Sequence, residues 1–510
     1  MSASRFSDQI IPSRAAFDAL ATRGNLVPVR LELLADLETP VSALVKLRRA
    51  NPGAPAFLLE SVEGGENLAR YSFLGVGARG ELKVKNRHAK LTFDGNTREW
   101  ELENGEDPLS VIEREMARFQ FVDAANLPRF CGGAVGFLGW EFVRFLEKLP
   151  DAPPDDRGIP DAQLLFCDTV LVFDAVRHTI TIFNCAHVEN GDAAAAYTRA
   201  VSAIEATVEA LSNEIVPSRP FPVQEIEEGQ PKSNFPSRAD FEGAVQKCID
   251  FIHQGDCVQI VPSQRFEVEL SADPLSVYRA LRHVSPAPYM VFLDLGDVQL
   301  LAASPEILVT EDKGNVLTRP LAGTRRRGAT PEEDIALEVE LLADPKEVAE
   351  HVMLVDLARN DLGRVCEYGS VEVTDLMYVQ RFSHVMHITS DVKGKLRKDK
   401  TAYDVLRAAF PAGTLSGAPK VRAMQIIDSV EPTRRGPYGG AMGYFGWNGD
   451  MDTCITLRTI VVKDGKAYVQ AGGGVVADSK PADEYEETRN KARAALRAIA
   501  LAQREAGGTG

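Results

Sequence analysis

The chain has 510 residues, enough for about two to four domains of roughly 100–200 residues each. With 45% hydrophobic and 25% charged residues, its composition is that of a globular protein and excludes a mainly disordered, collagenous or coiled-coil chain. The 57 basic and 73 acidic residues give a net charge of −16, which disfavours a general binder of nucleic acids or anionic membranes. A local cluster of cationic groups could still bind an anionic substrate.

Short helices and strands are predicted in turn through the N-terminal half. Helices are expected at 14–23 and 39–50, the second with Thr39 as its N-cap and Pro40 in its first turn. Strand patterns follow at 56–77 around a glycine turn, at 81–102 around Asp94-Gly95, and at 164–187, where two runs separated by a polar turn predict a hairpin. Residues 193–211 predict an alanine-rich helix.

A proline-rich segment separates the two halves. Residues 212–237 contain five prolines and little periodicity, so we predict a linker between an N-terminal domain (1–211) and a C-terminal domain (238–510). The second half again mixes helices with hairpins, such as 289–304 with its turn at Gly296-Asp297. Both halves therefore favour the α+β class over a doubly wound fold.

No apolar run reaches the ~18 residues that a membrane-spanning helix needs, and the start of the chain lacks a hydrophobic secretion signal. We therefore expect a cytoplasmic protein with no membrane or nucleic-acid partner. The seven cysteines form no Cys-x-x-Cys pair, so we expect free thiols rather than disulfides or a zinc site.

Two pairs of glutamates could hold a cation. Glu347 and Glu350 are three residues apart, on one face of a helix that Asp344 can cap, and Glu484 and Glu487 repeat the spacing near a second helix start. Mg²⁺ prefers oxygen ligands and usually accepts only one or two protein carboxylates. The alternatives left open are a capping-box role for Glu347 and ordinary acidic first turns that complement the helix dipole.

Glycine-rich segments and histidines supply further candidates. Residues 413–419 and 472–474 lack the P-loop pattern, but their backbone N–H groups could bind a carboxylate, the alternative being tight turns. His384 and His387 lie three apart on a predicted strand and face opposite sides, so a two-histidine metal site is not predicted.

Six long segments, in order, resemble the chorismate-utilising enzymes, and among them the large subunits (component I) of anthranilate synthases. These segments are LAASPEILV (301–309), TRPLAGTRRRG (318–328), DPKEVAEHVMLVDLARNDLGRV (344–365), FPAGTLSGAPKVRAMQIID (410–428), RRGPYGGAMGYFGWNGDMDTCITLRT (434–459) and QAGGGVVADSKPADEYEETRNKA (470–492). The N-terminal half resembles the family more thinly, chiefly at 57–75.

Two positions bear on the subtype. Aminodeoxychorismate synthases typically carry a nucleophilic lysine where this chain has Ala322, and isochorismate and salicylate synthases a water-activating lysine where it has Gln259. Both absences favour ammonia as the nucleophile and anthranilate as the product. The alternatives are an aminodeoxychorismate synthase component I and a catalytically silent tryptophan-sensing subunit.

The resemblance implies two intertwined α/β-sandwich units that convert chorismate and ammonia to anthranilate and pyruvate, the first step of tryptophan biosynthesis. It implies Mg²⁺ held by Glu350 and Glu487, with Glu347 and Glu484 in supporting positions or bound through water, and His387 as the acid–base group near the departing hydroxyl, with Thr414 close by. The implied substrate-binding residues are Gly323, Thr324, Tyr438, Arg458, Gly472, Gly473, Gly474 and Lys491.

Partners and regulation are also implied by the resemblance. Because no cysteine lies in a Gly-x-Cys-x-Gly elbow, ammonia is expected from a separate glutamine amidotransferase subunit (component II), in a heterotetramer. Feedback inhibition by tryptophan is expected at a site formed by Ser61, Pro288, Tyr289 and Met290.

Overall fold

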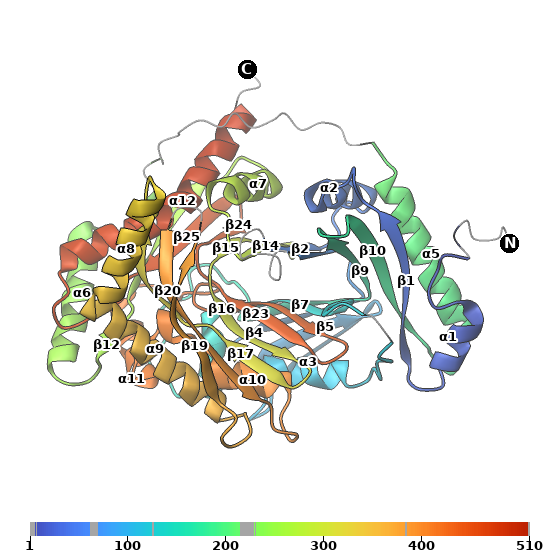
Figure 1. Cartoon of the computed structure of the whole chain (residues 1–510), viewed down its shortest axis with the longest axis horizontal. Helices are drawn as coiled ribbons and strands as arrows, with labels where there is room; N and C mark the ends of the chain where they lie inside the picture. Colours follow the sequence, from blue (N-terminus) through green and yellow to red (C-terminus); the bar gives the residue numbers. More distant parts are fainter. Residues whose placement is uncertain are drawn as a thin grey trace.

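The computed structural model describes residues 6, 8–61, 70–124, 127–214, 229, 231–382 and 385–507. Most of the predicted linker and His384 lie outside these residues. The described chain forms two large antiparallel sheets with helices around them (Figure 1), which confirms the predicted α+β class.

The first sheet has eleven described strands, and its order interleaves the two halves of the chain. Strands β2 and β14, from different halves, are direct neighbours. The order is β1 (Leu26–Leu34), β10 (Thr179–His187), β9 (Thr169–Asp174), β3 (Tyr71–Val76), β2 (Ala56–Glu60), β14 (Tyr289–Asp294), β15 (Gln299–Ser304), β24 (Thr459–Lys463), β25 (Lys466–Gly472), β13 (Ser263–Glu269) and β11 (Lys232–Ser233).

The second sheet is interleaved in the same way through its neighbours β22 and β7. Its order is β18 (Leu321–Arg326), β20 (Val385–Lys395), β17 (Asn315–Thr318), β16 (Ile307–Asp312), β23 (Met451–Ile455), β22 (Ala441–Gly446), β7 (Gly133–Leu138), β8 (Ala162–Cys167), β4 (Gly80–Lys85), β5 (His88–Phe93) and β6 (Asn96–Glu101), with β19 (Glu372–Arg381) also paired to β20. A small ladder joins β12 (Gln259–Ile260) to β21 (Gly417–Ala418). Both sheets thus cross the boundary at 212–237, and the division into two domains stays a prediction.

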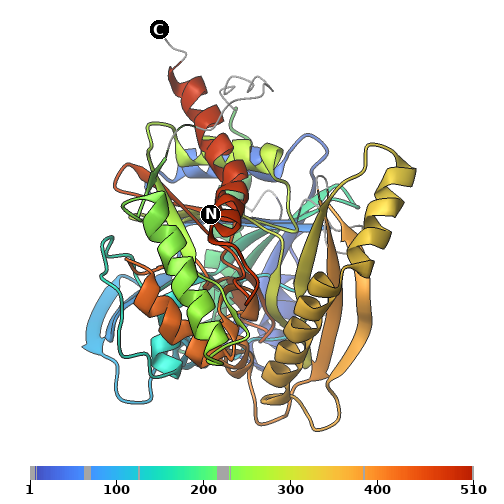
Figure 2. The ribbon, with the colours of Figure 1, turned by 90° about the vertical axis from the view of Figure 1, so that its left-hand side faces the viewer.

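Helices cover the outer faces of the sheets. Helices α8 and α9 pack on β18 and β20 at one end of the molecule, and α12 packs on β25, α6 and α7 (Figure 2). The described helices are α1 (Arg14–Leu20), α2 (Pro40–Ala50), α3 (Pro108–Met116), η1 (Trp140–Phe142), α4 (Val143–Leu146), α5 (Ala193–Leu211), α6 (Arg238–His253), α7 (Pro274–Val284), α8 (Pro331–Ala343), α9 (Pro345–Gly363), α10 (Ala402–Ala409), η2 (Gly413–Leu415), α11 (Lys420–Val430) and α12 (Pro481–Gly507).

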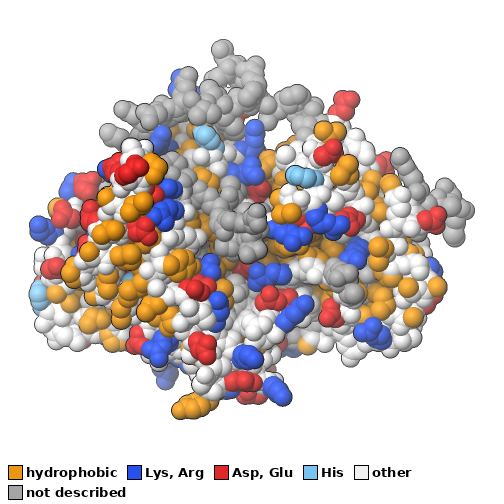
Figure 3. All heavy atoms as spheres, in the orientation of Figure 1, with side chains coloured by type: hydrophobic (Ala, Val, Ile, Leu, Met, Phe, Trp, Pro, Cys, Tyr) orange, Lys and Arg blue, Asp and Glu red, His pale blue; other side chains and the backbone are white. Residues whose placement is uncertain are grey.

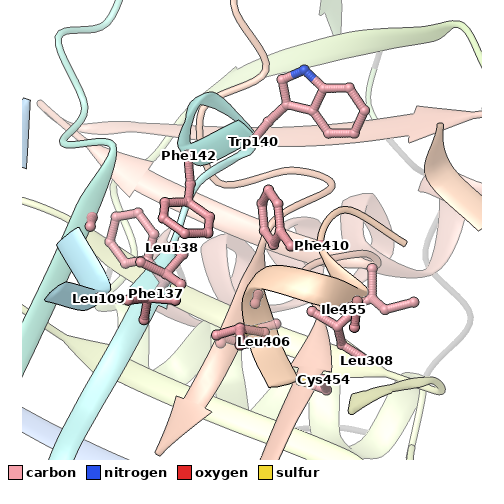
Figure 4. Close-up of a cluster of buried hydrophobic side chains, with 14 of the residues drawn as sticks. Leu109, Phe137, Leu138, Trp140, Phe142, Leu308, Leu406, Phe410, Cys454 and Ile455 are labelled. Carbon is pink, nitrogen blue, oxygen red and sulfur yellow. The ribbon is translucent and has the colours of Figure 1, made fainter. Parts of the chain in front are cut away.

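The first sheet is buried on both faces, which explains its continuous apolar strands. In β2, Phe57 packs into the core between the sheets, whereas the next residue, Leu58, packs into a second core beneath the helices. The core between the sheets continues to η1 and α10, where Phe142 and Phe410 meet edge to face with ring centroids 5.0 Å apart (Figure 4). Because both faces are buried, these strands are apolar throughout and lack the alternation of polar and apolar residues expected of a half-exposed strand.

The predicted hairpin at 164–187 is partly wrong. Strands β9 and β10 do form a hairpin, but β8 belongs to the second sheet, so the chain passes from one sheet to the other at Asp168. The pattern missed the crossing because the strands on both sides of Asp168 are apolar and buried.

Two other sequence-based expectations can be compared with the structure. All seven cysteines are buried and free, as expected. Among the described helices none is long and apolar enough to cross a membrane. On the surface, exposed hydrophobic side chains gather over α8 and α9, among them Ile335, Val339 and Val352 (Figure 3, left).

Candidate active site

Helix α9 presents the first pair of candidate metal ligands. Asp344 caps this helix by accepting from the N–H groups of Lys346 and Glu347, at 3.0 and 3.4 Å. The Glu347 side chain accepts from Arg325 Nη1 at 3.3 Å instead of closing a capping box. One turn further on, Glu350 accepts from the amide of Gln259 at 3.1 Å. Both carboxylates are thus held by side chains from other elements.

Helix α12 presents the second pair. Glu484 accepts from Ser479 Oγ at 2.8 Å through one oxygen, and its other oxygen is buried with no hydrogen-bond partner among the described residues. Glu487 is paired with Lys491, 2.7 Å away. Burial, followed by the nearby charge of Glu487, raises the pKa of Glu484 to about 7. The two carboxylates repel each other when both are charged, and a bound cation would relieve this repulsion.

Two glycines lie between the carboxylate pairs. A Cβ at Gly473 would be 2.6 Å from a carboxylate oxygen of Glu484 and 3.6 Å from one of Glu487. A Cβ at Gly474 would be 2.7 Å from the Gln259 amide nitrogen and 3.7 Å from a carboxylate oxygen of Glu350. The absence of side chains at 473 and 474 therefore lets their backbone lie close to Glu484 on α12 and to Gln259, the partner of Glu350 on α9.

The residues at this position fit Mg²⁺. All the donors are carboxylate oxygens, and Glu484 contributes a buried oxygen that lacks a partner within the described chain. No three His, Cys, Asp or Glu side chains of the described residues come together as a complete metal cage. Mg²⁺ needs no such cage, since it usually binds one or two protein carboxylates together with water and substrate oxygens.

His387 lies on β20 and is buried at 2% exposure. Its Nδ1 is 2.8 Å from the carbonyl oxygen of Gly323 and 3.1 Å from Thr324 Oγ1. Since a carbonyl only accepts, Nδ1 carries the proton and Nε2 is left as an acceptor, with no partner among the residues described. Burial, together with the charge of Arg458, lowers the pKa of His387 to about 4, so the imidazole is neutral near pH 7.

The carbonyl that orients His387 belongs to a β-bulge. The register of β18 against β20 shifts between Ala322 and Arg325, and Gly323 has a φ of +68°. This left-handed conformation suits glycine and is strained for other residues. The bulge thus explains why a glycine occupies position 323 within a strand. The sequence pattern alone gave no reason for it.

The expected neighbour of His387, Thr414, has a different partner. Its hydroxyl donates to Glu306 Oε1 at 2.8 Å. Glu306 is 4% exposed and lies between β15 and β16. Burial raises its pKa to about 8, even though Thr414, the Leu321 backbone and Arg458 favour the charged form. Near neutral pH, Glu306 is therefore a protonated acid beside the candidate site.

Sequence reasoning missed Glu306, although the motif LAASPEILV contains it. The available signal was a single glutamate between two strands that are otherwise apolar. An ionisable group in such a run is either paired or neutral. Its neutral state could only be seen once the structure showed how deeply it is buried.

Cationic and polar groups complete the site. Arg458 is buried next to Glu306, and burial lowers its pKa. The buried hydroxyl of Tyr438 hydrogen-bonds to the backbone of Gly472, and Lys491 Nζ donates to the Gly472 carbonyl at 3.0 Å. The Lys491 ammonium group and the Tyr438 hydroxyl thus both lie at Gly472, and a cationic group there suits a carboxylate-bearing substrate.

The predicted tryptophan segments are brought together outside this site. Antiparallel pairing of β2 with β14 sets Glu60 opposite Met290, and Ser61 follows directly. Glu60 accepts from Tyr278 Oη at 2.7 Å and from Arg282 at 3.1 Å. Tyr289, in turn, donates its hydroxyl to Asp452 at 2.9 Å.

Comparisons with known proteins place this chain in a family. A family model described as chorismate binding enzyme matches residues 54–497. The anthranilate synthase component 1 of Pseudomonas aeruginosa is 48% identical over 96% of this chain and 99% of its own length. The protein of the same name from Acetivibrio thermocellus is 48% identical over 93% of this chain and 95% of its own.

Solved structures agree in fold. Anthranilate synthase component I from Streptococcus pneumoniae superposes with a TM-score of 0.73 at 36% identity, over 91% of this chain and 99% of its own. A menaquinone-specific isochorismate synthase from Escherichia coli gives a TM-score of 0.68 at 17% identity, over 95% of this chain and 98% of its own, and supports the fold alone. The chain belongs to the chorismate-binding enzymes, which confirms the resemblance drawn from its motifs.

Proposed function

We propose that this protein is the large subunit of an anthranilate synthase, which converts chorismate and ammonia to anthranilate and pyruvate as the first step of tryptophan biosynthesis. The observation that carries the proposal is Gln259. Its amide is bound to Glu350 beside the open glycine backbone, where a lysine would be needed to deprotonate water. An amide is no base, so the nucleophile has to be one that attacks without first being deprotonated, as ammonia does.

The buried groups divide the work of the reaction. Arg458 and Tyr438 bind the enolpyruvyl carboxylate, and the backbone of 472–474 and 323–324 lines the rest of the substrate site, where the Gly473 N–H already donates to the Pro262 carbonyl at 3.2 Å. Glu350 and Glu487, with Glu347 and Glu484 beside them, would hold Mg²⁺, which would supply positive charge for the ring carboxylate.

Proton transfer is assigned to Glu306 and His387. As the carbon–nitrogen bond forms, the bond to the ring 4-hydroxyl breaks and its electron pair leaves with the oxygen. Glu306 gives that oxygen a proton, so water departs. With its Nδ1 proton fixed on Gly323, His387 keeps Nε2 available to accept a proton during the elimination of pyruvate.

The nitrogen source should distinguish this chain from an enzyme that can itself use glutamine. We expect the purified chain to form anthranilate from chorismate, Mg²⁺ and ammonium, faster at alkaline pH because free NH₃ is then more abundant. Glutamine should replace ammonium only after a component II amidotransferase is added, with which the chain would form a cytoplasmic heterotetramer. Anthranilate fluorescence measures both reactions. Glutamine-dependent activity in the chain alone would contradict the proposal.

Feedback inhibition by tryptophan is proposed for the segments around β2 and β14. Ser61 and Pro288–Met290 come from different halves of the chain and lie at the same end of paired strands. Glu60 is bound by Tyr278 and Arg282, and we assign acceptance from the tryptophan amine to Ser61 and nearby backbone carbonyls. A ligand that grips both strands would favour one relative placement of them, as allosteric inhibition requires.

Ser61→Phe is expected to relieve inhibition by tryptophan by about 5- to 150-fold, the range of a typical allosteric coupling. Uninhibited turnover should change little, because Ser61 lies outside the catalytic groups. The check is the tryptophan concentration that halves anthranilate formation. Ser202→Phe, on the exposed face of α5, is the matched control. An unchanged inhibition curve for Ser61→Phe would place the inhibitor site elsewhere.

A further inference from the structure

A small cavity has Glu306 in its wall. Its volume is about 40 Å³, and Thr414 and Asp361 also line it. The walls are mostly apolar and include Leu308 and Ile455, which Figure 4 shows in the core near α10. A water molecule needs ~10–15 Å³ of such volume, so the cavity has room for about three.

Glu306 links this cavity to the candidate substrate groups. It lines the cavity, and the charges of Arg458 and Lys491 act on its carboxyl group. Thr414, which donates to one of its oxygens, also lines the cavity. An acid that gives up its proton in each turnover must regain one, and a substrate in the site would block the direct route from solvent.

Asp361 supplies a charged group in the mostly apolar wall. It is 6% exposed, and its Oδ1 is buried with no hydrogen-bond partner in the described part of the chain. Its Oδ2 accepts from Lys420 Nζ at 2.9 Å, and Lys420 is itself partly exposed. The other charge that acts on Asp361 is Arg364, which directly follows the same helix. A buried oxygen that lacks a partner is the kind of group that ordered water satisfies.

We propose that this cavity holds water and forms a proton path from solvent, past Lys420 and Asp361, to Glu306. Asp361 acts through Glu306 and is a positioning residue for proton transfer, since it does not touch the substrate. The inference rests on the proposed function only in that chorismate loses its 4-hydroxyl as water.

The protons balance over one turnover. Ammonia forms the new bond with its lone pair and becomes a substituted ammonium, which then releases one proton. Glu306 gives one proton to the departing oxygen and regains one along the water chain. The path thus returns to Glu306 a proton equivalent to the one that the new amine releases, and no further reactant is needed.

Two variants test the path. Ala358→Leu fills the cavity from α9, and Asp361→Asn keeps the shape but removes the ionisable group. Each is expected to lower kcat for chorismate consumption by about tenfold, a part of the ~10²–10⁴-fold that acid catalysis contributes, with KM for chorismate and Mg²⁺ binding unchanged. The solvent deuterium isotope effect on kcat should rise, because regaining the proton becomes limiting. A purely structural role would not move it.

The controls separate the possible failures. Ala408→Leu overpacks α10 at a position that is equally buried, 8% exposed against 8% for Ala358, but does not line the cavity. It should keep wild-type kcat and isotope effect. The proposal is wrong if Ala358→Leu keeps both, or if Ala408→Leu changes them equally. Should Asp361→Asn fail to fold without a partner for Lys420, Ala358→Leu and the smaller Ala358→Val decide. Chorismate consumption without anthranilate would refute the proposed function but leave this test intact.

Discussion

Glu306→Gln is expected to lower kcat for chorismate by about 10²-fold or more, because it removes the proton that the departing hydroxyl needs. The variant should fold normally, since glutamine has the shape of the neutral acid and its carbonyl can accept from Thr414. In the wild type, kcat at saturating ammonia should fall as pH rises through about 8, where Glu306 loses its proton. The variant should lack that decline. Steady-state rates from pH 6 to 10 provide the measurement.

Folding stability gives an independent check on the same residue. The pKa of Glu306 is higher in the folded chain than in the unfolded one, so the folded state binds more protons between pH ~4.5 and ~8. Its contribution to stability is therefore present at low pH and is lost as pH rises through that window. Glu306→Gln should flatten this part of the unfolding curve. Glu311→Gln is the matched control for removing a buried glutamate of raised pKa. Glu311 is also buried, with its pKa raised to about 7, but it lies away from the site. A normal kcat in Glu306→Gln would exclude Glu306 as the acid.

Local signals predicted many of the elements. Thr39 and Asp344 cap α2 and α9 where the sequence placed those helix starts, and the turn at Gly296-Asp297 joins β14 to β15. These features depend on a few neighbouring residues, so they can be recognised in a short window of sequence. The pairings of β2 with β14 and of β22 with β7 bring together residues hundreds of positions apart. No local pattern specifies them, and the intertwined arrangement came from the resemblance.

The same distinction between local and tertiary signals applies to the candidate site. The motifs named its glycines, carboxylates and His387, but the interactions between them depend on the tertiary structure. The bulge at Gly323 gives His387 a backbone partner, and burial between distant segments makes Glu306 a neutral acid and leaves Thr414 bound to it. The pKa of a side chain reflects its whole surroundings, so its state could not be predicted from neighbours in sequence.

Glu487→Gln and Glu350→Gln are each expected to reduce turnover by about 100-fold or more, because Mg²⁺ stabilises charge worth several kcal/mol in such reactions. Binding of Mg²⁺, measured by calorimetry or by competition with Mn²⁺, should weaken in parallel. The fold should persist, since losing one acidic side chain near a helix start costs only about 0.3–1 kcal/mol. Wild-type turnover by Glu487→Gln in limiting Mg²⁺ would contradict the metal assignment.

The geometry also predicts how Mg²⁺ binding depends on pH. Because the pKa of Glu484 is raised to about 7, protons compete with the cation, and affinity should fall as pH drops below that value. Glu484→Gln should remove most of this dependence. Glu486→Gln is the control: Glu486 lies on the same turn of α12 but faces outward, paired with Arg238 at 2.8 Å, and its loss should leave metal affinity unchanged. Equal losses of affinity in Glu486→Gln and Glu487→Gln would mean that the cation responds to the general charge of α12, and that no bound site exists between α9 and α12.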